Sequence, residues 1–119
     1  MAYNTRMPND PLKIEDLLGP SDDDRVLRLI GPLTITNLFE FQSLVRANLK
    51  PRLVIDFTHV PFIDSAGLGA MVGAHVSHQK KGGKLALAGV NDRVRGSMKI
   101  MQIDQFFVFY PTVEAAHSG

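Results

Sequence analysis

A short, nearly apolar run, Leu53–Phe57, constrains the fold of this chain more than any other feature. Asp56 is its one polar residue, so both faces of a strand formed here would be mostly apolar. Strands of this composition are buried on both sides and occur chiefly in parallel sheets that helices cover. The run therefore predicts a central strand of a parallel sheet in an α/β domain.

A helix is expected before this strand. Asn37 and Glu40 have the spacing of a capping box, in which two side chains bond to the backbone at a helix start. Apolar residues then recur at helical intervals, and Pro51 would end the helix. We expect the helix over residues 37–49, with Leu38, Phe41, Leu44, Val45 and Leu49 facing inward.

A second helix is expected after the strand, from about Ser65 to Gln79. The run K-K-G-G at residues 80–83 would end it. Lysines suit the negative C-terminal end of the helix dipole, and glycine suits the position just past the last turn. The periodicity predicts an inward-facing stripe made of Leu68, Met71, Val72, His75 and Val76.

The remaining segments continue this alternation. Leu12–Leu18 fits either a strand or a helical turn, but the turn composition that follows it and the strand expected at Arg25–Ile30 favour a β-hairpin. Two further strands are expected at Lys84–Val90 and Phe106–Tyr110. The helices expected around them are one capped by Asn91, with Val94, Met98 and Met101 facing inward, and a short one at Val113–His117 capped by Thr112.

The resulting order is β-β-α-β-α-β-α-β-α. Strands that alternate with helices in this way imply crossover connections and a mostly parallel sheet after the N-terminal hairpin. The chain has 119 residues, enough for one domain with a single core. Residues 1–10 are mostly polar, so we expect a disordered tail there and one α/β domain over residues 11–119.

Composition excludes several classes of function. The net charge is +1, so the protein lacks a strong electrostatic field that would favour binding to nucleic acid or to an anionic membrane. No uninterrupted apolar run reaches the length of about 18 residues that a membrane span needs, and the N-terminus lacks the apolar region of a signal peptide. The absence of cysteine excludes disulfides, thiol catalysis and cysteine-zinc sites. We expect a cytoplasmic protein with no cofactor and no direct nucleic-acid or membrane partner.

Glycines around Ser65 suggest three kinds of enzyme site, and the spacing argues against each. A nucleophile elbow needs glycine two residues before the serine, where Ile63 stands. A dinucleotide fingerprint that begins at Gly67 and Gly69 would need its third glycine at Val72. A phosphate-binding loop that ends at residues 83–84 would need glycine at position 78 and Ser or Thr at position 85, which are His and Leu.

Histidines and basic residues give weaker signals. His75 and His78 are spaced to share a metal, but no further ligand cluster accompanies them, and the simpler expectation is one half-buried and one solvated histidine. A modest basic cluster is usually a solvated face, although it could help to dock an acidic partner. No aromatic residues interleave with this cluster, which argues against nucleic-acid binding. Its members are Lys80, Lys81, Lys84, Arg93, Arg95 and Lys99.

The segment Asp64–Gly69 (D-S-A-G-L-G) allows two interpretations. In the structural one, Asp64 or Ser65 caps the second helix and the two glycines serve only packing. In the functional one, Gly67 and Gly69 bare the backbone around Ser65, at a cost of about 1 kcal/mol each relative to alanine, so that a macromolecule can approach. The exposed hydroxyl of Ser65 would then accept a phosphate, which a helix N-terminus tolerates and a partner surface built for neutral serine does not.

The motif V-P-F-I-D-S-A-G-L-G at residues 60–69 closely resembles the signature of STAS domains, especially the bacterial anti-sigma factor antagonists. The strand L-V-I-D-F-T, the turn K-K-G-G-K and the helix start N-D-R-V-R belong to the same resemblance, which covers about residues 12–117. It implies a small α/β fold with helices chiefly on one face of the sheet, and a protein that is not an enzyme.

The resemblance also implies a phosphorylation switch. Unphosphorylated antagonists bind a serine-kinase anti-sigma factor and free its sigma factor. The kinase then phosphorylates the serine after the motif aspartate, here Ser65, and a PP2C-type phosphatase resets it. The partner surface implied for this chain comprises Asp64, Ser65, Ala66, Gly67, Leu68 and Gly69, part of Met71 and Val72, and the loop residues Gly31, Pro32, Leu33 and Thr34.

Two departures from the family pattern bear on this expectation. The loop reads G-P-L-T at residues 31–34 where the family commonly has G-E-L-D, so both acidic positions are lost, and we expect the partner to be recognised differently or to belong to another subfamily. Ala66 replaces a frequent Ser or Thr, which leaves Ser65 as the only motif hydroxyl. The alternative function is a STAS accessory subunit of a membrane lipid or anion transporter that needs no phospho-switch.

Overall fold

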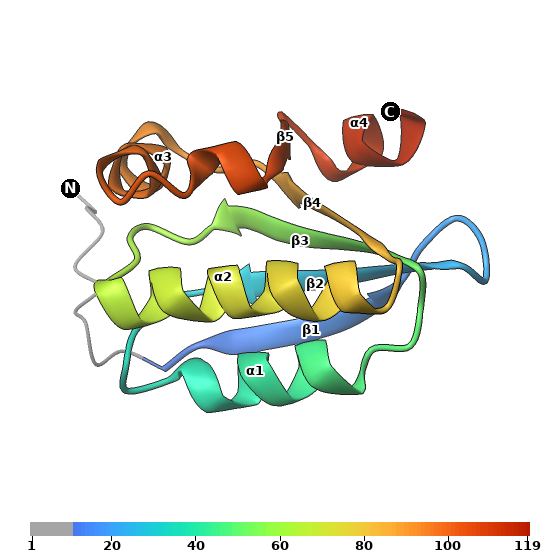
Figure 1. Ribbon diagram of the computed structural model, residues 1–119, viewed down its shortest axis with the longest axis horizontal. Helices are drawn as coiled ribbons and strands as arrows, with labels where there is room; N and C mark the ends of the chain where they lie inside the picture. The colour runs from blue at the N-terminus through green and yellow to red at the C-terminus, as the bar shows by residue number, and fades with distance from the viewer. Residues whose placement is uncertain (1–10) are drawn as a thin grey trace, which may run out of the picture.

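The protein is a five-stranded sheet with helices on both faces (Figure 1). The computed structural model describes residues 11–119, and the tail expected at residues 1–10 lies outside them. The strands lie in the order β1-β2-β3-β4-β5; β1 pairs with β2 antiparallel, and the other pairs are parallel. The strands are β1 (Lys13–Leu18), β2 (Asp24–Ile30), β3 (Arg52–His59), β4 (Lys84–Ala88) and β5 (Val108–Tyr110). The predicted hairpin and the mostly parallel sheet are both confirmed.

Three helices cover one face of this sheet and a fourth covers part of the other. The helices are α1 (Leu38–Ala47), α2 (Ser65–Lys80), α3 (Asp92–Ile100) and α4 (Val113–Ser118), with a short 3₁₀ helix, η1 (Asp104–Phe106), before β5. In Figure 1, α1 and α2 run side by side and in the same direction across the sheet. The predicted placement of helices chiefly on one face is confirmed.

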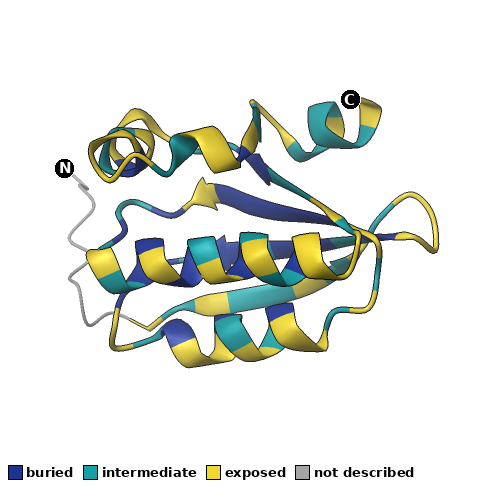
Figure 2. Ribbon diagram, viewed as in Figure 1, coloured by how far each residue is buried: buried dark blue, intermediate teal, exposed yellow. Residues whose placement is uncertain are grey.

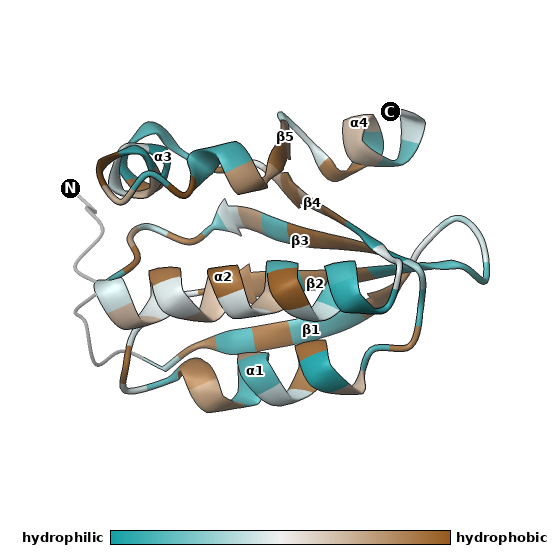
Figure 3. Cartoon of the chain, viewed as in Figure 1, coloured by the Kyte–Doolittle hydropathy of each residue, from teal (hydrophilic) through white to brown (hydrophobic). Residues whose placement is uncertain are grey.

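The apolar run that predicted the fold is the centre of the core. Leu53, Ile55 and Phe57 of β3 are at most 1% exposed and pack in the main cluster with residues of α1, α2 and α3. Val54 faces the opposite side, where it packs with Val26 and Ala88 beneath α4. Figures 2 and 3 show β3 as both buried and largely hydrophobic. Each such side chain stabilises the fold by about 1.5–3 kcal/mol, so β3 fixes the position of the loop that follows it.

The start and end of α1 differ from the prediction. Asn37 does not cap the helix with its side chain; it turns back, accepts a hydrogen bond from the N–H of Thr34 at 2.9 Å and donates to the carbonyl of Pro32 at 2.8 Å. The capping box is therefore wrong, because the loop before the helix competes successfully for this side chain. The helix ends at Ala47, so Leu49 lies outside it and is 87% exposed.

The inward face of α2 is made of smaller residues than predicted. Leu68 and Met71 are buried as expected, but Val76 is exposed, and Ala70 and Ala74 are buried instead. Because α1 packs beside α2, the buried face is rotated toward small residues that let the two helices approach.

His78 is buried, so the expectation of one half-buried and one solvated histidine is wrong for this residue; His75 is half-buried. Burial lowers the pKa of the His78 imidazole, so the ring is neutral at neutral pH and its Nε2 accepts a hydrogen bond from Asn48 Nδ2 at 3.0 Å. This histidine therefore joins the end of α2 to the segment after α1.

The C-terminal third shows two further differences. Met101 follows α3 and is 52% exposed, whereas Val94 and Met98 are buried as predicted. Phe106 belongs to η1, so the last strand is shorter than expected and spans only Val108–Tyr110. Asn91 and Thr112 cap α3 and α4 with their side chains, as predicted.

A buried carboxylate ties β2 to the start of β3. Asp24 is 5% exposed and accepts hydrogen bonds from Arg52 Nε at 2.7 Å and from the hydroxyl of Ser21 at 2.7 Å. These bonds, that of Arg52 first, hold the pKa of the Asp24 carboxyl well below its usual range. A depressed pKa in the folded state stabilises the fold above the unfolded-state pKa, and this contribution is lost as the pH falls.

We therefore expect Asp24→Asn to lower the urea midpoint of unfolding at neutral pH. The difference from wild type should shrink as the pH falls below about 4, where the carboxyl of the unfolded chain becomes protonated. Urea titrations of both proteins across this pH range test the expectation. A difference that stays constant with pH would show that the charge of Asp24 does not contribute.

Candidate functional site

Two loops lie side by side beyond the ends of β2 and β3. The β2–α1 loop (residues 31–37) and the β3–α2 loop (residues 60–64) continue the pairing of their strands through a parallel bridge between Leu33 and Ile63. Leu33 N–H donates to the carbonyl of Phe62 and Asp64 N–H donates to the carbonyl of Leu33, each at 3.3 Å. The two loops therefore form one surface at the start of α2.

The Asp64 carboxylate joins this loop pair to α2. Its Oδ1 accepts from the N–H of Gly67 at 2.8 Å, which caps the helix, and its Oδ2 accepts from the N–H of Ile35 at 3.1 Å. Asp64, not Ser65, is thus the N-cap that the sequence left undecided. One residue satisfies a free donor of the helix and a free donor of the β2–α1 loop.

Ser65 is the first residue of α2 and is exposed. Its hydroxyl makes no hydrogen bond to any residue in the described part of the chain. The N–H groups of Ser65 and Ala66 precede the first intrahelical bond, and the helix dipole is positive at this end. Because Asp64 performs the capping, the serine hydroxyl is left available for chemistry at a position that tolerates negative charge.

The two motif glycines have different roles. Gly67 is buried, and a Cβ there would overlap the carbonyl oxygen of Leu33, so glycine is required for the close approach of α2 to the β2–α1 loop. A Cβ at Gly69 would meet nothing within 4 Å, so only this glycine opens the outer surface. The hypothesis that both glycines give clearance to a partner is therefore wrong for Gly67.

The residues predicted to contact a partner divide into two groups. Ser65 and Gly69 are exposed, and Asp64, Ala66 and Val72 are partly exposed, so these residues form a surface together. The other predicted residues are buried and support that surface from beneath: Gly31, Pro32, Leu33, Thr34, Gly67, Leu68 and Met71. The structure thus brings the two predicted segments together. The exposed residues all come from the motif and α2, and the four predicted loop residues are all buried.

Two exposed apolar residues, one in the β2–α1 loop and one in the first turn of α1, were missed from the sequence. Ile35 is 60% exposed and Phe39 is 73% exposed, and the hydrogen bond from Ile35 N–H to Asp64 ties the first of them to the motif. Phe39 lies outside the inward stripe of α1, between the buried residues Leu38 and Phe41. The sequence signal for Phe39 was available: it is a large apolar residue that does not fall on the inward-facing stripe of its helix.

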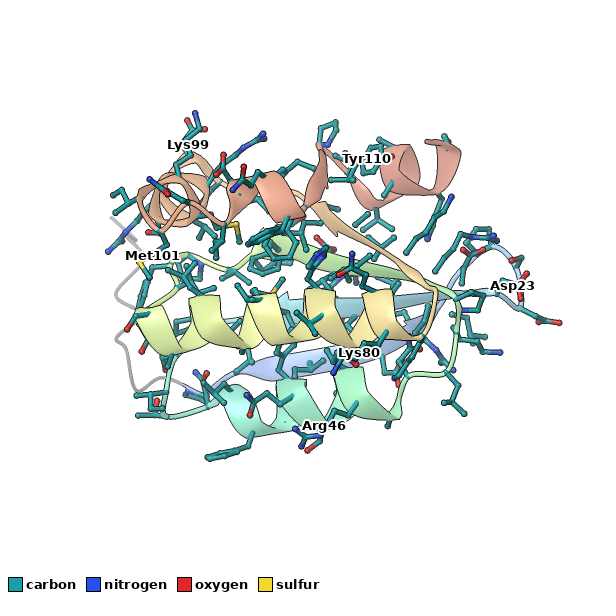
Figure 4. All side chains as sticks on the ribbon, viewed as in Figure 1. Asp23, Arg46, Lys80, Lys99, Met101 and Tyr110 are labelled. Atoms are coloured by element: carbon teal, nitrogen blue, oxygen red, sulfur yellow. The ribbon has the colours of Figure 1, made fainter. Side chains whose placement is uncertain are left out.

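The basic residues do not form one patch. Lys80 lies at the C-terminal end of α2 and Lys99 lies on α3, far apart in Figure 4. Lys81 donates from Nζ to the carbonyls of Arg46 and Asn48, each at 3.1 Å, and so covers the end of α1. Arg93 and Arg95 stack on the rings of Phe62 and Phe109. The predicted cluster is therefore wrong, since packing of the helices separates residues that are close in sequence.

Neither a metal site nor a membrane span was found in the described residues. Within residues 11–119 no group of three or more His, Asp or Glu side chains is placed to hold a metal ion. None of the helices in this range is long and apolar enough to cross a membrane.

The STAS domain family model matches residues 19–116, which include every residue of the site described above. The chain belongs to the STAS domain family. Among solved structures, it is similar to a putative anti-sigma factor antagonist of Thermotoga maritima, with a TM-score of 0.79 and 24% identity over 88% of this chain and 92% of that chain. It is similar also to the antagonist SpoIIAA in its unphosphorylated form, with a TM-score of 0.75 and 17% identity over 89% and 94% of the two chains.

The same fold occurs in a sulfate transporter family protein of Wolinella succinogenes, with a TM-score of 0.65 and 21% identity over 82% of this chain and 84% of that chain. The structure of SLC26A9 matches with a TM-score of 0.72 and 15% identity over 96% of this chain but only 24% of that chain. Identities this low show the shared fold alone, so these neighbours do not by themselves choose between the two kinds of function.

The contrast between the motif glycines gives a paired prediction. Gly67→Ala should lower the free energy of unfolding by about 1–3 kcal/mol, because the new methyl group displaces the Leu33 backbone. Gly69→Ala should raise it by up to about 1 kcal/mol, because alanine favours the helix and has open space. Urea unfolding of the two variants measures both values; equal effects would contradict the assigned roles.

Proposed function

We propose that this STAS domain is an anti-sigma factor antagonist whose binding is switched off by phosphorylation of Ser65. The observation that supports the proposal most directly is an exposed serine hydroxyl at a helix start where the neighbouring aspartate provides the cap. Unphosphorylated, the protein binds a serine-kinase anti-sigma factor in the bacterial cytoplasm. The sigma factor that this kinase held is then free to activate transcription.

Phosphorylation acts on the interface and not on the fold. A phosphate on Ser65 adds about −1.5 to −2 charges beside the N–H groups at the start of α2, which favour an anion. The fold therefore tolerates the modified serine. A partner surface shaped for neutral Ser65 would bury that charge without a counter-charge, at a cost on the order of 2–5 kcal/mol. The complex then dissociates.

The domain itself supplies no catalysis in this cycle. The partner kinase transfers the phosphoryl group from ATP to the Ser65 hydroxyl, and a PP2C-type phosphatase removes it by hydrolysis. The role of this chain is to present Ser65 on a fixed surface. Ile35 and Phe39 provide apolar contact area beside it, where the G-P-L-T loop lacks acidic residues. We infer that the part of the partner surface next to the β2–α1 loop is recognised through these apolar side chains and not through acidic residues of the loop.

A second candidate function is an accessory STAS subunit of a membrane lipid or anion transporter. It is a candidate because the sulfate transporter family protein of Wolinella succinogenes has the same fold. Such a subunit would need neither a free Ser65 hydroxyl nor an open surface at Gly69. The antagonist function accounts for both features and is therefore preferred.

The proposed switch predicts opposite behaviour of two Ser65 variants. Ser65→Asp places a carboxylate in the interface and should weaken binding to the cognate kinase at least about 30-fold, which corresponds to 2 kcal/mol. Ser65→Ala should bind as wild type does, but ATP should no longer release it. Calorimetric titration of the kinase with each variant, with and without ATP, measures both effects.

Circular dichroism and urea unfolding serve as the fold control, since both variants should remain as stable as wild type. Tight kinase binding by a folded Ser65→Asp protein would contradict the switch. Co-purification with a transporter subunit in place of a kinase would support the second candidate.

A further inference from the structure

A groove runs between α1 and α2 on the outer surface, away from the sheet. Its volume is about 350 Å³. Buried side chains form its floor, among them Phe41 and Val45 of α1 and Ala74 of α2. The exposed side chain of Val76 adds an apolar wall. The groove begins at Gly69, one helical turn from Ser65, and extends to Lys80, a length of about 16 Å along the axis of α2.

Two cations stand at the far end of this groove. Arg46 of α1 and Lys80 of α2 both line it, and Figure 4 shows their side chains on neighbouring stretches of the two helices. Neither forms an ion pair with a residue of the described chain. Helix α2 has no acidic residue, and Glu40, the one acidic residue of α1, does not line the groove. The groove therefore presents positive charge that the domain itself does not neutralise.

The depth of the groove is not required by the packing of this domain. Gly69 and Gly73 form part of its wall, and a Cβ at either position would meet nothing within 4 Å. Alanine at these exposed helix positions would favour the helix without a clash. Glycine at both positions keeps the groove open over its whole length, so that another backbone can come close to α2.

From these observations we infer that the groove binds an acidic amphipathic helix of the partner. The inference rests on the proposed function, since the partner is the serine-kinase anti-sigma factor that acts on Ser65. The apolar face of this helix packs above the buried floor, against exposed Val76 and the open backbone at Gly69 and Gly73, and carboxylates at one of its ends pair with Arg46 and Lys80. About eleven residues, or three turns, match the length of the groove. Docking there would hold the kinase while its active site reaches Ser65, and it would set partner choice through charge.

The test compares groove variants with matched variants elsewhere in the fold. Gly73→Leu fills the groove, and its control is Gly96→Leu, because Gly96 is another helical glycine with open space around it. Lys80→Gln removes a groove charge, and its control is Lys99→Gln, which removes a charge from the last turn of α3. Kd values for the unphosphorylated protein and the purified cognate kinase are measured by calorimetric titration at low and at high salt.

Both groove variants should weaken kinase binding at least about tenfold, and both controls should bind within about twofold of wild type. The loss caused by Lys80→Gln should diminish at high salt, because screening removes the same attraction. Circular dichroism confirms that each variant is folded; if Gly73→Leu fails to fold, the double variant Arg46→Gln/Lys80→Gln takes its place.

The outcomes separate this inference from the proposed function. If the folded groove variants bind the kinase normally and Ser65→Asp does not bind it, the proposed role of the groove is overturned. The antagonist function would then still stand. Normal binding by Ser65→Asp would instead contradict the phospho-switch. A wild-type protein that does not bind the kinase would overturn both.

Discussion

The carboxylate of Asp64 accepts one hydrogen bond from α2 and one from the β2–α1 loop, and the candidate site depends on this pair of bonds. Neither segment is held to the other by sequence proximity, since Ile35 and Asp64 are 29 residues apart. The sheet places the two loops in register through the bridge between Leu33 and Ile63, and the carboxylate then joins them at the surface. Buried Gly67 permits the contact, because any side chain there would push the loop away from the helix.

Two adjacent residues at the start of α2 have separate roles, one structural and one chemical. Serine and aspartate are both good N-caps, and a capping serine would engage its hydroxyl with the backbone. Asp64 takes the structural role, so the hydroxyl of Ser65 stays exposed at the positive end of the helix dipole. The proposed phosphate on Ser65 would therefore change the surface charge while the contacts that hold the surface remain. The exposed apolar residues Ile35 and Phe39 lie in the β2–α1 loop and the first turn of α1, and the basic groove runs along α1 and α2.

Local patterns predicted most of the fold, and long-range contacts account for most of the errors. The apolar run Leu53–Phe57 and the alternation around it were enough to predict the parallel sheet and the position of Ser65 at a helix start. The burial of Gly31–Thr34 could not be predicted, because it follows from pairing with a loop some 30 residues later in the chain. Asn37 failed as a cap for the same reason, since its side chain bonds to the loop that this pairing shapes. The distinction between Gly67 and Gly69 likewise depends on the Leu33 carbonyl, which no local pattern reveals.

The most direct test of the role of Asp64 is amide hydrogen exchange in wild type and in Asp64→Asn, measured by NMR. Asparagine keeps one acceptor oxygen and is a good N-cap, so the bond from Gly67 N–H should persist. Its amide nitrogen cannot accept a hydrogen bond, so Ile35 N–H should lose its partner. Exchange at Ile35 should accelerate at least about tenfold while Gly67 stays protected. Unchanged exchange at Ile35 would contradict the claim that this carboxylate joins the loop to the helix.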